Sequence, residues 1–446
     1  MTSENVCLQI PNQLLRVRMA RFFQRSSCGH RGEGLRASRD IVPGQLLYSA
    51  SPYTYIPSKK ARSSVCEHCL SRKESLLRCS QCKMARYCNA TCQKLAWPDH
   101  KRECKCLRSI YPNVPTDMTR LVARIIFKLI TASPCSSEEL YSVSDLQSNI
   151  KEMSEEMKGS LGQLTVVLQF YIKEEIHNAS QLPPGLDLLR LFGQVTCNCF
   201  TISDGEMQEL GVGLYPSMSL VNHSCDPNCT IVFEGKQLQL HAVRQIQVDE
   251  ELTVSYIDVM ATSQERQRQL EKQYCFVCDC KRCEMADKDS DLLAGEEHAW
   301  KEVEESIPKV EELQSAGNSE EIVDLCQAIL DKYRDVLPDT NLHLLKMLDA
   351  AMDACIHLAR WEDALGYGVR TLQPYQLYYA GPHPVRGVQL MRVGKLQHHQ
   401  GMLEQASDTL KQAFDILKVT HGREHSLTGN LKQILAECEA ELSSRT

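Results

Sequence analysis

The sequence predicts an α+β multidomain protein, in which a β-rich core carries a zinc-binding module and a helical insertion and is followed by an all-α region. Three observations support this class. They are close pairs of Cys and His between residues 66 and 104, a polar segment at 222–229 that precedes an alternating strand, and helical periodicity after residue 286. A chain of 446 residues is also too long for a single core, so we expect two to four domains.

The composition excludes some classes of protein. Charged residues make up 24% of the chain and hydrophobic residues 43%, as in ordinary soluble proteins. We expect no membrane contact, since even the apolar run at 121–130 is interrupted by Arg124 and Lys128. The 22 cysteines are unusual. Most lie in tight spacing beside basic residues, which favours thiolate-bound zinc in a reducing compartment over disulfides.

Residues 1–29 form a predicted N-terminal extension of unusual charge. No acidic residue lies between Glu4 and Glu33, whereas arginines alternate with apolar side chains. An Arg-rich, acid-poor amphipathic start can act as a mitochondrial targeting signal. The alternative, which we favour, is an extended or alternative amino terminus, with Met19 as a second candidate start.

Residues 30–62 open the β-rich core. The glycines of Arg31-Gly32-Glu33-Gly34 suit a turn, and residues 43–48 fit a turn followed by a short strand. A lone pair of glycines usually marks only a turn, so this segment identifies no ligand by itself.

The segment 66–104 contains the strongest motif of the chain. Eight soft ligands stand in four pairs, which suit two closed tetrahedral zinc sites with a structural role. The pairs are Cys66 and Cys69, Cys79 and Cys82, Cys88 and Cys92, and His100 and Cys104. Residues 59–108 also carry 13 Lys and Arg against four acids. This basic face predicts either a contact with DNA or an acidic peptide, or a merely solvated surface.

Residues 115–195 have helical periodicity, with apolar residues recurring at intervals of three and four. They carry no chemistry of their own. We expect a helical insertion that divides the β-rich core. Residues 196–260 return to that core through the segment 197–202 and the alternating strand 230–233.

The segment Asn222–Cys229 combines an amide, an imidazole and two thiols with a proline. Such a cluster at the mouth of a β core predicts a functional site. Further along the chain, a predicted strand at 250–256 precedes Cys278, Cys280 and Cys283. These three cysteines lack the fourth ligand of a closed zinc site.

In combination, the Asn222-His223-Ser224-Cys225 segment, the strand ending in Tyr256 and the trailing cysteines resemble the core and post-SET region of a SET-domain lysine methyltransferase. With the early zinc module and the helical tail, residues 30–446 resemble the SET-and-MYND-domain (SMYD) family. The resemblance implies a SET domain split by two insertions. Its parts are a first SET segment (30–62), a MYND-type zinc finger (66–104), a helical insertion (115–195), the SET core (196–260), a post-SET zinc region (261–285) and a TPR-like helical domain (286–446).

The family resemblance also implies ligands and roles. One MYND zinc ion binds Cys66, Cys69, Cys88 and Cys92, the other binds Cys79, Cys82, His100 and Cys104, and a third ion binds Cys225, Cys278, Cys280 and Cys283. S-Adenosylmethionine contacts Arg31, Gly32, Glu33, Tyr141, Asn149, Asn222, His223, Tyr256 and Phe276. Phe200, Tyr256 and Tyr274 line the channel for the substrate lysine. Glu33 departs from the amide or basic residue usual in the family, so we expect backbone contacts at this position.

After Asp287 the sequence predicts long amphipathic helices. Similar units begin at Ser319, Trp361 and Leu403, 42 residues apart, a period typical of stacked helix pairs. Such arrays bind peptide tails in a concave groove, and the family resemblance implies a ninety-kilodalton heat-shock chaperone as the partner. A buttress that closes over the SET domain is a compatible alternative.

We therefore expect a protein-lysine N-methyltransferase of the cytoplasm and nucleus that acts on histone tails and other proteins. The reaction depends mainly on alignment of amine and methyl group and on a dry aromatic channel that lowers the pKa of the lysine. The alternative is a zinc-dependent chromatin or chaperone adaptor with an inactive SET site, and Glu33 is the one feature in its favour. Transfer of labelled methyl to a protein lysine would distinguish the two.

Overall fold

The structure, a computed structural model, describes residues 22–131, 140–286 and 288–445. Of the Arg-rich start on which the targeting hypothesis rests, residues 1–21 lie outside the described residues, whereas Arg25 and Arg31 lie within them. The fold begins before the boundary expected at residue 30, because β1 (Phe23–Ser27) pairs antiparallel with β2 (Glu33–Ala37). This pairing buries Phe23. Residues 23–27 therefore belong to the folded core.

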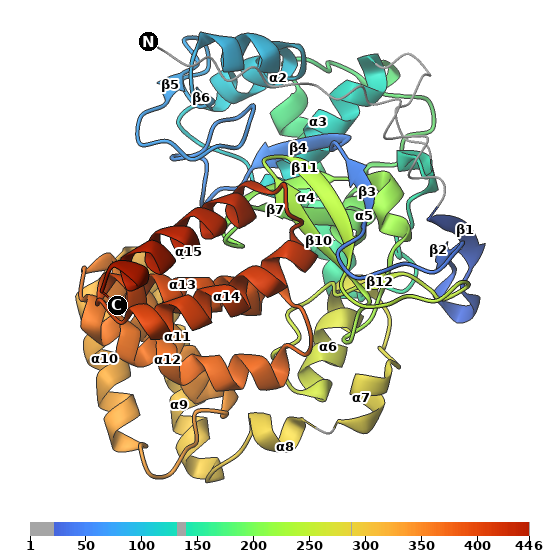
Figure 1. The fold of residues 1–446 in the computed structure, drawn as a ribbon. Coiled ribbons are helices and arrows are strands. Elements are labelled where there is room, and N and C mark those ends of the chain that lie inside the picture. Colours follow the sequence, from blue (N-terminus) through green and yellow to red (C-terminus); the bar gives the residue numbers. More distant parts are fainter. Residues whose placement is uncertain (1–21, 132–139, 287, 446) are drawn as a thin grey trace.

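Short sheets form the β core in the middle of the molecule (Figure 1). β11 (Gln237–Ala242) lies between β3 (Leu46–Ala50) and β10 (Cys229–Glu234), and β8 (Glu209–Leu214) lies between β4 (Thr54–Pro57) and β7 (Cys199–Ser203). β9 (Asn222–His223) pairs in parallel with β12 (Thr253–Val254). The strand predicted at 230–233 is present within β10. Of the strand expected at 250–256, only Thr253 and Val254 join a ladder, and Glu251 makes an isolated bridge with Arg36.

The zinc module follows β4. β5 (Leu77–Arg78) and β6 (Arg86–Tyr87) form a hairpin, and α2 (Ala90–Ile110) comes next. The side chain of Asn89 caps α2 by accepting a hydrogen bond from the N–H of Cys92. The helix continues past Cys104 and so extends the module toward the insertion.

The helical insertion consists of α3 (Asp117–Thr131), α4 (Glu155–Ile172) and α5 (Leu188–Asn198). Arg120 and Arg124 of α3 are buried although they are cationic. Glu103 accepts from Arg120 Nε at 2.8 Å, and Glu67 accepts from Arg124 Nη2 at 2.8 Å. These four residues, which we call the ion cluster, join the insertion to the zinc module.

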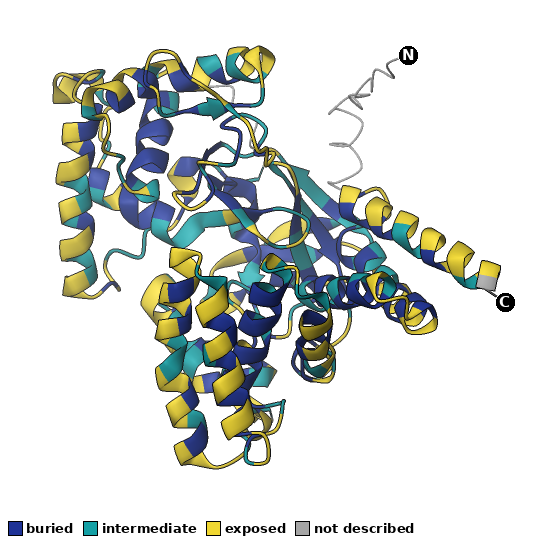
Figure 2. Cartoon of the chain, turned by 90° about the vertical axis from the view of Figure 1, so that its left-hand side faces the viewer, coloured by how far each residue is buried: buried dark blue, intermediate teal, exposed yellow. Residues whose placement is uncertain are grey.

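After the core, α6 (Ser263–Tyr274), α7 (Lys281–Met285) and α8 (Asp289–Leu292) lead to the helical domain. Its helices are α9 (Glu297–Ala316), α10 (Ser319–Lys332), α11 (Leu342–His357), α12 (Trp361–Tyr378), α13 (Pro384–His399), α14 (Leu403–Thr420) and α15 (Ser426–Arg445). α10, α12 and α14 begin 42 residues apart, as do α11, α13 and α15, in agreement with the sequence period. Their buried sides face one another and their outer sides are exposed (Figure 2).

The helical domain closes on the β core at the junction of α14 and α15. Nε2 of His425 lies 3.0 Å from the carbonyl oxygen of Phe233, and the N–H of Ser426 donates to the Glu234 carboxylate at 3.0 Å. Gly422 lies so close to His241 that a Cβ would stand 3.1 Å from the ring. These contacts cover β10 and β11, as the buttress hypothesis requires. Among the described helices, none combines the length and apolar character needed to cross a bilayer.

Candidate active site and metal centres

The structure gathers the twelve predicted zinc ligands into three groups of four. In each group the ligand atoms lie within 4.8 Å of one another. The groups are Cys66, Cys69, Cys88 and Cys92, then Cys79, Cys82, His100 and Cys104, and finally Cys225, Cys278, Cys280 and Cys283. Within the zinc module, the first and third pairs form one group and the second and fourth pairs form the other, as expected from the family resemblance.

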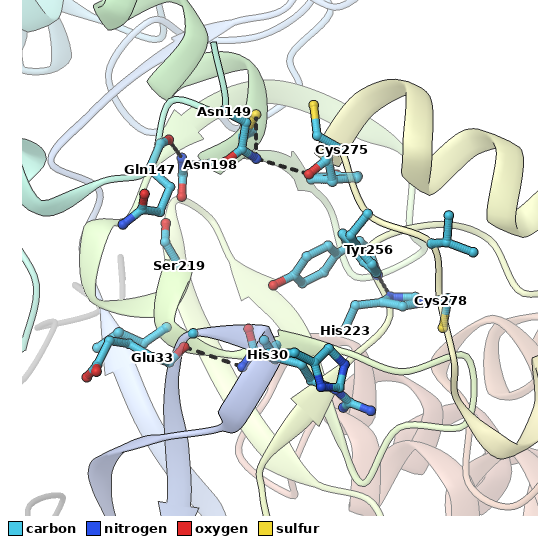
Figure 3. A pocket seen from close by; sticks show the side chains of 18 of the residues that line it. His30, Glu33, Gln147, Asn149, Asn198, Ser219, His223, Tyr256, Cys275 and Cys278 are labelled. Atoms are coloured by element: carbon cyan, nitrogen blue, oxygen red, sulfur yellow. Dashed lines mark hydrogen bonds between the residues drawn. The ribbon is translucent and has the colours of Figure 1, made fainter. Parts of the chain in front are cut away.

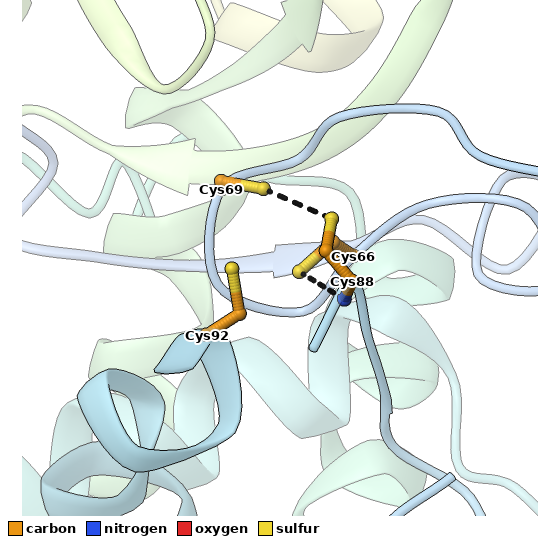
Figure 4. A group of neighbouring side chains, drawn as sticks. All are labelled: Cys66, Cys69, Cys88 and Cys92. Carbon is orange, nitrogen blue, oxygen red and sulfur yellow. Dashed lines mark hydrogen bonds between the residues drawn. The ribbon is translucent and has the colours of Figure 1, made fainter. Parts of the chain in front are cut away.

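The spacing of the ligand atoms fits zinc. Cys69 Sγ lies 3.6 Å from Cys88 Sγ (Figure 4), and Cys225 Sγ lies 3.5 Å from Cys283 Sγ. A tetrahedral ion with Zn–S bonds of about 2.3 Å places its sulfurs roughly 3.8 Å apart, whereas a disulfide needs about 2.05 Å. The second and third groups are fully buried, so these sites are closed, as structural zinc sites are.

A cavity of about 330 Å³ opens between the β core, the insertion and the segment after α6 (Figure 3). All nine residues predicted to contact the cofactor line it. They are Arg31, Gly32, Glu33, Tyr141, Asn149, Asn222, His223, Tyr256 and Phe276. The structure therefore brings together residues that are up to 245 positions apart in the sequence.

Asn222 forms one wall of this cavity. Its Nδ2 donates to Glu251 Oε1 at 2.8 Å and to the carbonyl oxygen of Glu33 at 3.3 Å. Gly34 is required beside it, because a Cβ at this position would stand 2.8 Å from the same Nδ2 and 2.6 Å from Cys28 Sγ. Sequence analysis noted Gly34 only as a turn residue.

Glu33 shows how the departure from the family pattern is accommodated. Its carboxylate accepts from Arg25 Nε at 2.7 Å, and both side chains are 45% exposed. The backbone carbonyl accepts from Asn222 instead. The acidic side chain is thus engaged by Arg25, and the backbone of the loop contributes to the cavity wall, as expected.

Arg31 connects two walls of the cavity. Its guanidinium lies 3.6 Å from Glu251 and 3.2 Å from Asp279, a residue of the post-SET region. His30 also contacts Asp279, at 3.1 Å. Asp279 was not predicted, although its place between Cys278 and Cys280 could have indicated it.

Asn149 ties the insertion to the segment after α6. Its Nδ2 donates to the carbonyl oxygen of Tyr274 at 3.0 Å and lies 3.6 Å from Cys197 Sγ. Gln147, Asn198 and Ser219 also line the cavity and were not predicted. No motif marks these polar residues in the sequence, because the three segments meet only in the folded protein.

A second cavity, of about 490 Å³, also has Tyr256 in its lining. The two cavities share a throat, which we define by the residues lining both: Cys197, Asn198, Ser219, Tyr256 and Tyr274. Phe200 lines the second cavity only, as does Asp258. The three predicted channel residues are therefore at the throat or just beyond it.

Aromatic side chains surround the throat. The rings of Tyr256 and Tyr274 are 4.9 Å apart, and Phe276 lies 6.5 Å from Tyr256, edge to face. The Tyr256 hydroxyl donates to the carbonyl oxygen of Val221 at 2.7 Å. Burial raises the pKa of Tyr256 and Tyr274 well above the usual range, so both hydroxyls stay protonated and neutral at pH 7.

This arrangement suits a transfer between two ligands. A ligand in the first cavity and a side chain entering through the second can meet only at the throat. Its lining offers aromatic rings and hydroxyls but neither a carboxylate nor a lysine. Such a site can align and dehydrate reactants, and it is poorly equipped for general acid–base catalysis.

Comparisons with known proteins agree with this geometry. The SET domain family matches residues 32–257. Human histone-lysine N-methyltransferase SMYD3 is 55% identical over 412 residues, which cover 92% of this chain and 96% of that protein. The mouse protein of the same name is 54% identical over 94% of this chain and 98% of its own length. Chicken N-lysine methyltransferase SMYD2 is 32% identical over 93% of this chain and 97% of its own length.

Proposed function

Because this chain belongs to the SET-and-MYND-domain family of lysine methyltransferases, we propose that its joined cavities transfer methyl from S-adenosylmethionine to lysine side chains. The substrates in this proposal are histones and other proteins. The observation that carries it is the throat that the two cavities share, which is lined by Tyr256 and Tyr274. A cofactor in the first cavity and a substrate lysine in the second would meet there.

The first cavity offers what the cofactor requires. S-Adenosylmethionine supplies an electrophilic methyl group on a cationic sulfur. Arg31 and Asn222 can bind the amino-acid end, and Phe276 offers an aromatic face for the adenine ring. The chemistry of the lining residues and the volume of the first cavity both suit S-adenosylmethionine.

The throat prepares the nucleophile. Tyr256, Tyr274 and Phe200 exclude water, and this desolvation lowers the pKa of a lysine that enters from the second cavity. The lysine ammonium would release its proton to solvent, and the neutral amine would then displace the methyl group from the sulfonium, which would leave as a neutral thioether. The Tyr256 hydroxyl already donates to Val221, which leaves its oxygen lone pairs to accept from the amine and orient it.

The test measures transfer of tritiated methyl to histones and to a lysine-containing peptide library, with mass spectrometry to count the methyl groups. We expect label on lysine only. An enzyme that binds the cofactor with ordinary affinity but labels no lysine would support the adaptor alternative. Glu33 is the one feature that favours the adaptor alternative. Its carboxylate is paired with Arg25, so the structure gives that alternative little support.

We further propose two partners and a location. The Lys and Arg side chains of residues 59–108 would bind DNA, and the repeated helix pairs would bind the tail of a ninety-kilodalton heat-shock chaperone, in the cytoplasm and the nucleus. DNA affinity should fall steeply as salt rises. Titration of the chain with the chaperone tail peptide tests the second partner. If the chain does not bind DNA even at low salt, the DNA proposal is wrong. If it does not bind the isolated chaperone tail peptide, the chaperone proposal is wrong.

A further inference from the structure

The side chain of His223 lies between the throat and the post-SET metal group. It comes from β9, and only 5% of the residue is exposed. Its Nδ1 accepts a hydrogen bond from the backbone N–H of Tyr256 at 3.0 Å. Its Nε2 lies 3.3 Å from Cys225 Sγ, which is one of the four ligands of the post-SET metal group. One imidazole thus contacts both the throat tyrosine and a metal ligand.

The donor and acceptor roles follow from the first contact. A backbone N–H can only donate, so Nδ1 of His223 must be the unprotonated nitrogen of a neutral imidazole. The proton then resides on Nε2 and is directed at Cys225 Sγ. A metal-bound thiolate is a good acceptor for it. The chain of interactions therefore runs from metal ligand to imidazole to the backbone of Tyr256.

The imidazole is placed where the backbone support ends. The ladder between β9 and β12 stops at Val254, and the N–H of Ser224 donates to the carbonyl oxygen of Val254 at 3.0 Å. Tyr256 lies two residues beyond this ladder. The ladder uses only the backbone of His223, whereas the N–H of Tyr256 donates to the His223 imidazole in place of a strand partner.

We propose that His223 is a positioning residue that couples metal binding at Cys225 to the placement of Tyr256 in the throat. This inference rests on the proposed function only for its effect on methyl transfer. Hydrogen bonds to ligand atoms orient them and tune the metal. When the metal is bound, Cys225 is fixed, His223 is fixed by Cys225, and Tyr256 is held at the throat. The third metal site would thus support catalysis without touching the substrate.

Simple packing is the competing explanation. The His223 ring lies 5.3 Å from the Tyr256 ring and 6.0 Å from the Phe276 ring, as centroid distances. A His223→Phe variant keeps an aromatic ring at this place and removes both hydrogen bonds. A His223→Gln variant has an amide oxygen to accept from Tyr256 and an amide N–H to donate to Cys225. The two variants separate packing from hydrogen bonding.

The test uses full-length protein in which zinc is replaced by Co²⁺. The spectrum of a Cys225→Ser variant is subtracted to isolate the thiolate-to-cobalt band of the post-SET site. In His223→Phe this band should move to longer wavelength, because the thiolate loses a hydrogen bond that stabilises its electrons. Release of zinc from this site to a chelator should become about 10- to 100-fold faster, while the two sites of the zinc module serve as internal controls.

Methyl transfer supplies the second readout. We expect His223→Phe to lower kcat by about 10- to 100-fold and His223→Gln to recover part of both the metal and the kinetic loss. A loss of activity with an unchanged cobalt band and unchanged zinc release would overturn the coupling in favour of packing. The metal measurements do not depend on methyl transfer. They therefore test the coupling even if the wild-type protein transfers no methyl, and failure of the proposed function can be distinguished from failure of this inference.

Discussion

The ion cluster makes a quantitative prediction about how the zinc module is held. Glu103 is fully buried and accepts from Arg120 Nε and Arg124 Nε, both at 2.8 Å, and from the Tyr171 hydroxyl at 3.2 Å. Burial alone would raise the pKa of Glu103, but the two guanidinium groups hold it well below its ordinary value. The carboxylate is therefore ionised, and Glu67 supplies the second negative charge.

Glu103→Gln would leave two buried guanidinium groups facing the single carboxylate of Glu67. Removing one partner of a buried ion pair typically costs about 3–5 kcal/mol. We expect the free energy of local opening of α3 to fall by this amount. Hydrogen exchange of peptides from α3, at neutral pH, measures it. Exchange is the suitable assay because a chain of several domains need not unfold in one step.

A charge-balanced variant provides the matched control. Glu103→Met combined with Arg120→Met removes one charge of each sign and leaves Glu67 with Arg124, so the loss should be clearly smaller than in Glu103→Gln. Zinc content must stay at the wild-type value, because Glu103 precedes the ligand Cys104. A Glu103→Gln protein within about 1 kcal/mol of the wild type would show that this cluster does not hold the module in place.

Three further predictions concern the throat, the post-SET metal and the helical domain. Tyr256→Phe keeps the ring and removes one hydroxyl, so methyl transfer should fall about 10- to 1,000-fold with little change in cofactor affinity; unchanged turnover would restrict Tyr256 to packing. Cys225→Ser should lower the metal content from three zinc ions to two and abolish transfer, and elemental analysis that still gives three would refute this ligand. Burial raises the pKa of Asp349 to about 7, so the folded state retains a proton that the unfolded state releases, and stability should fall as pH rises from about 4 to 7. Asp349→Asn should remove this dependence and stabilise the protein at pH 8 by about 2–4 kcal/mol, whereas an unchanged pH profile would show that Asp349 titrates normally.

The metal groups could be predicted from the sequence because their information is local. In the zinc module the two ligands of each pair are separated by two or three residues, and a short segment offers little apolar core in which eight soft ligands could be buried without an ion. The family resemblance was needed to divide the four pairs between two ions and to supply the fourth ligand of the post-SET group. Cys225 lies 53 residues before Cys278, and no spacing rule joins them.

The ion cluster could not be predicted, and Arg124 shows why. In the sequence it interrupts the apolar run 121–130, so it counted only as evidence against a membrane span. In the structure it is 7% exposed and pairs with two acids of another module. A sequence pattern distinguishes polar from apolar residues, but a buried cation is identified only by the partner that neutralises it.

The throat depends on the same kind of long-range contact. Several modules contribute to it, although its lining offers little acid–base chemistry. Part of its aromatic wall is the short segment from Tyr274, the last residue of α6, to Phe276. One end of that segment is held by Asn149, which donates to the carbonyl oxygen of Tyr274 at 3.0 Å. The other end is held at Cys278 by the post-SET metal group, whose member Cys225 also contacts His223. Since catalysis by alignment tolerates displacements of much less than 1 Å, the insertion and the metal act on the reaction by fixing both ends of this wall.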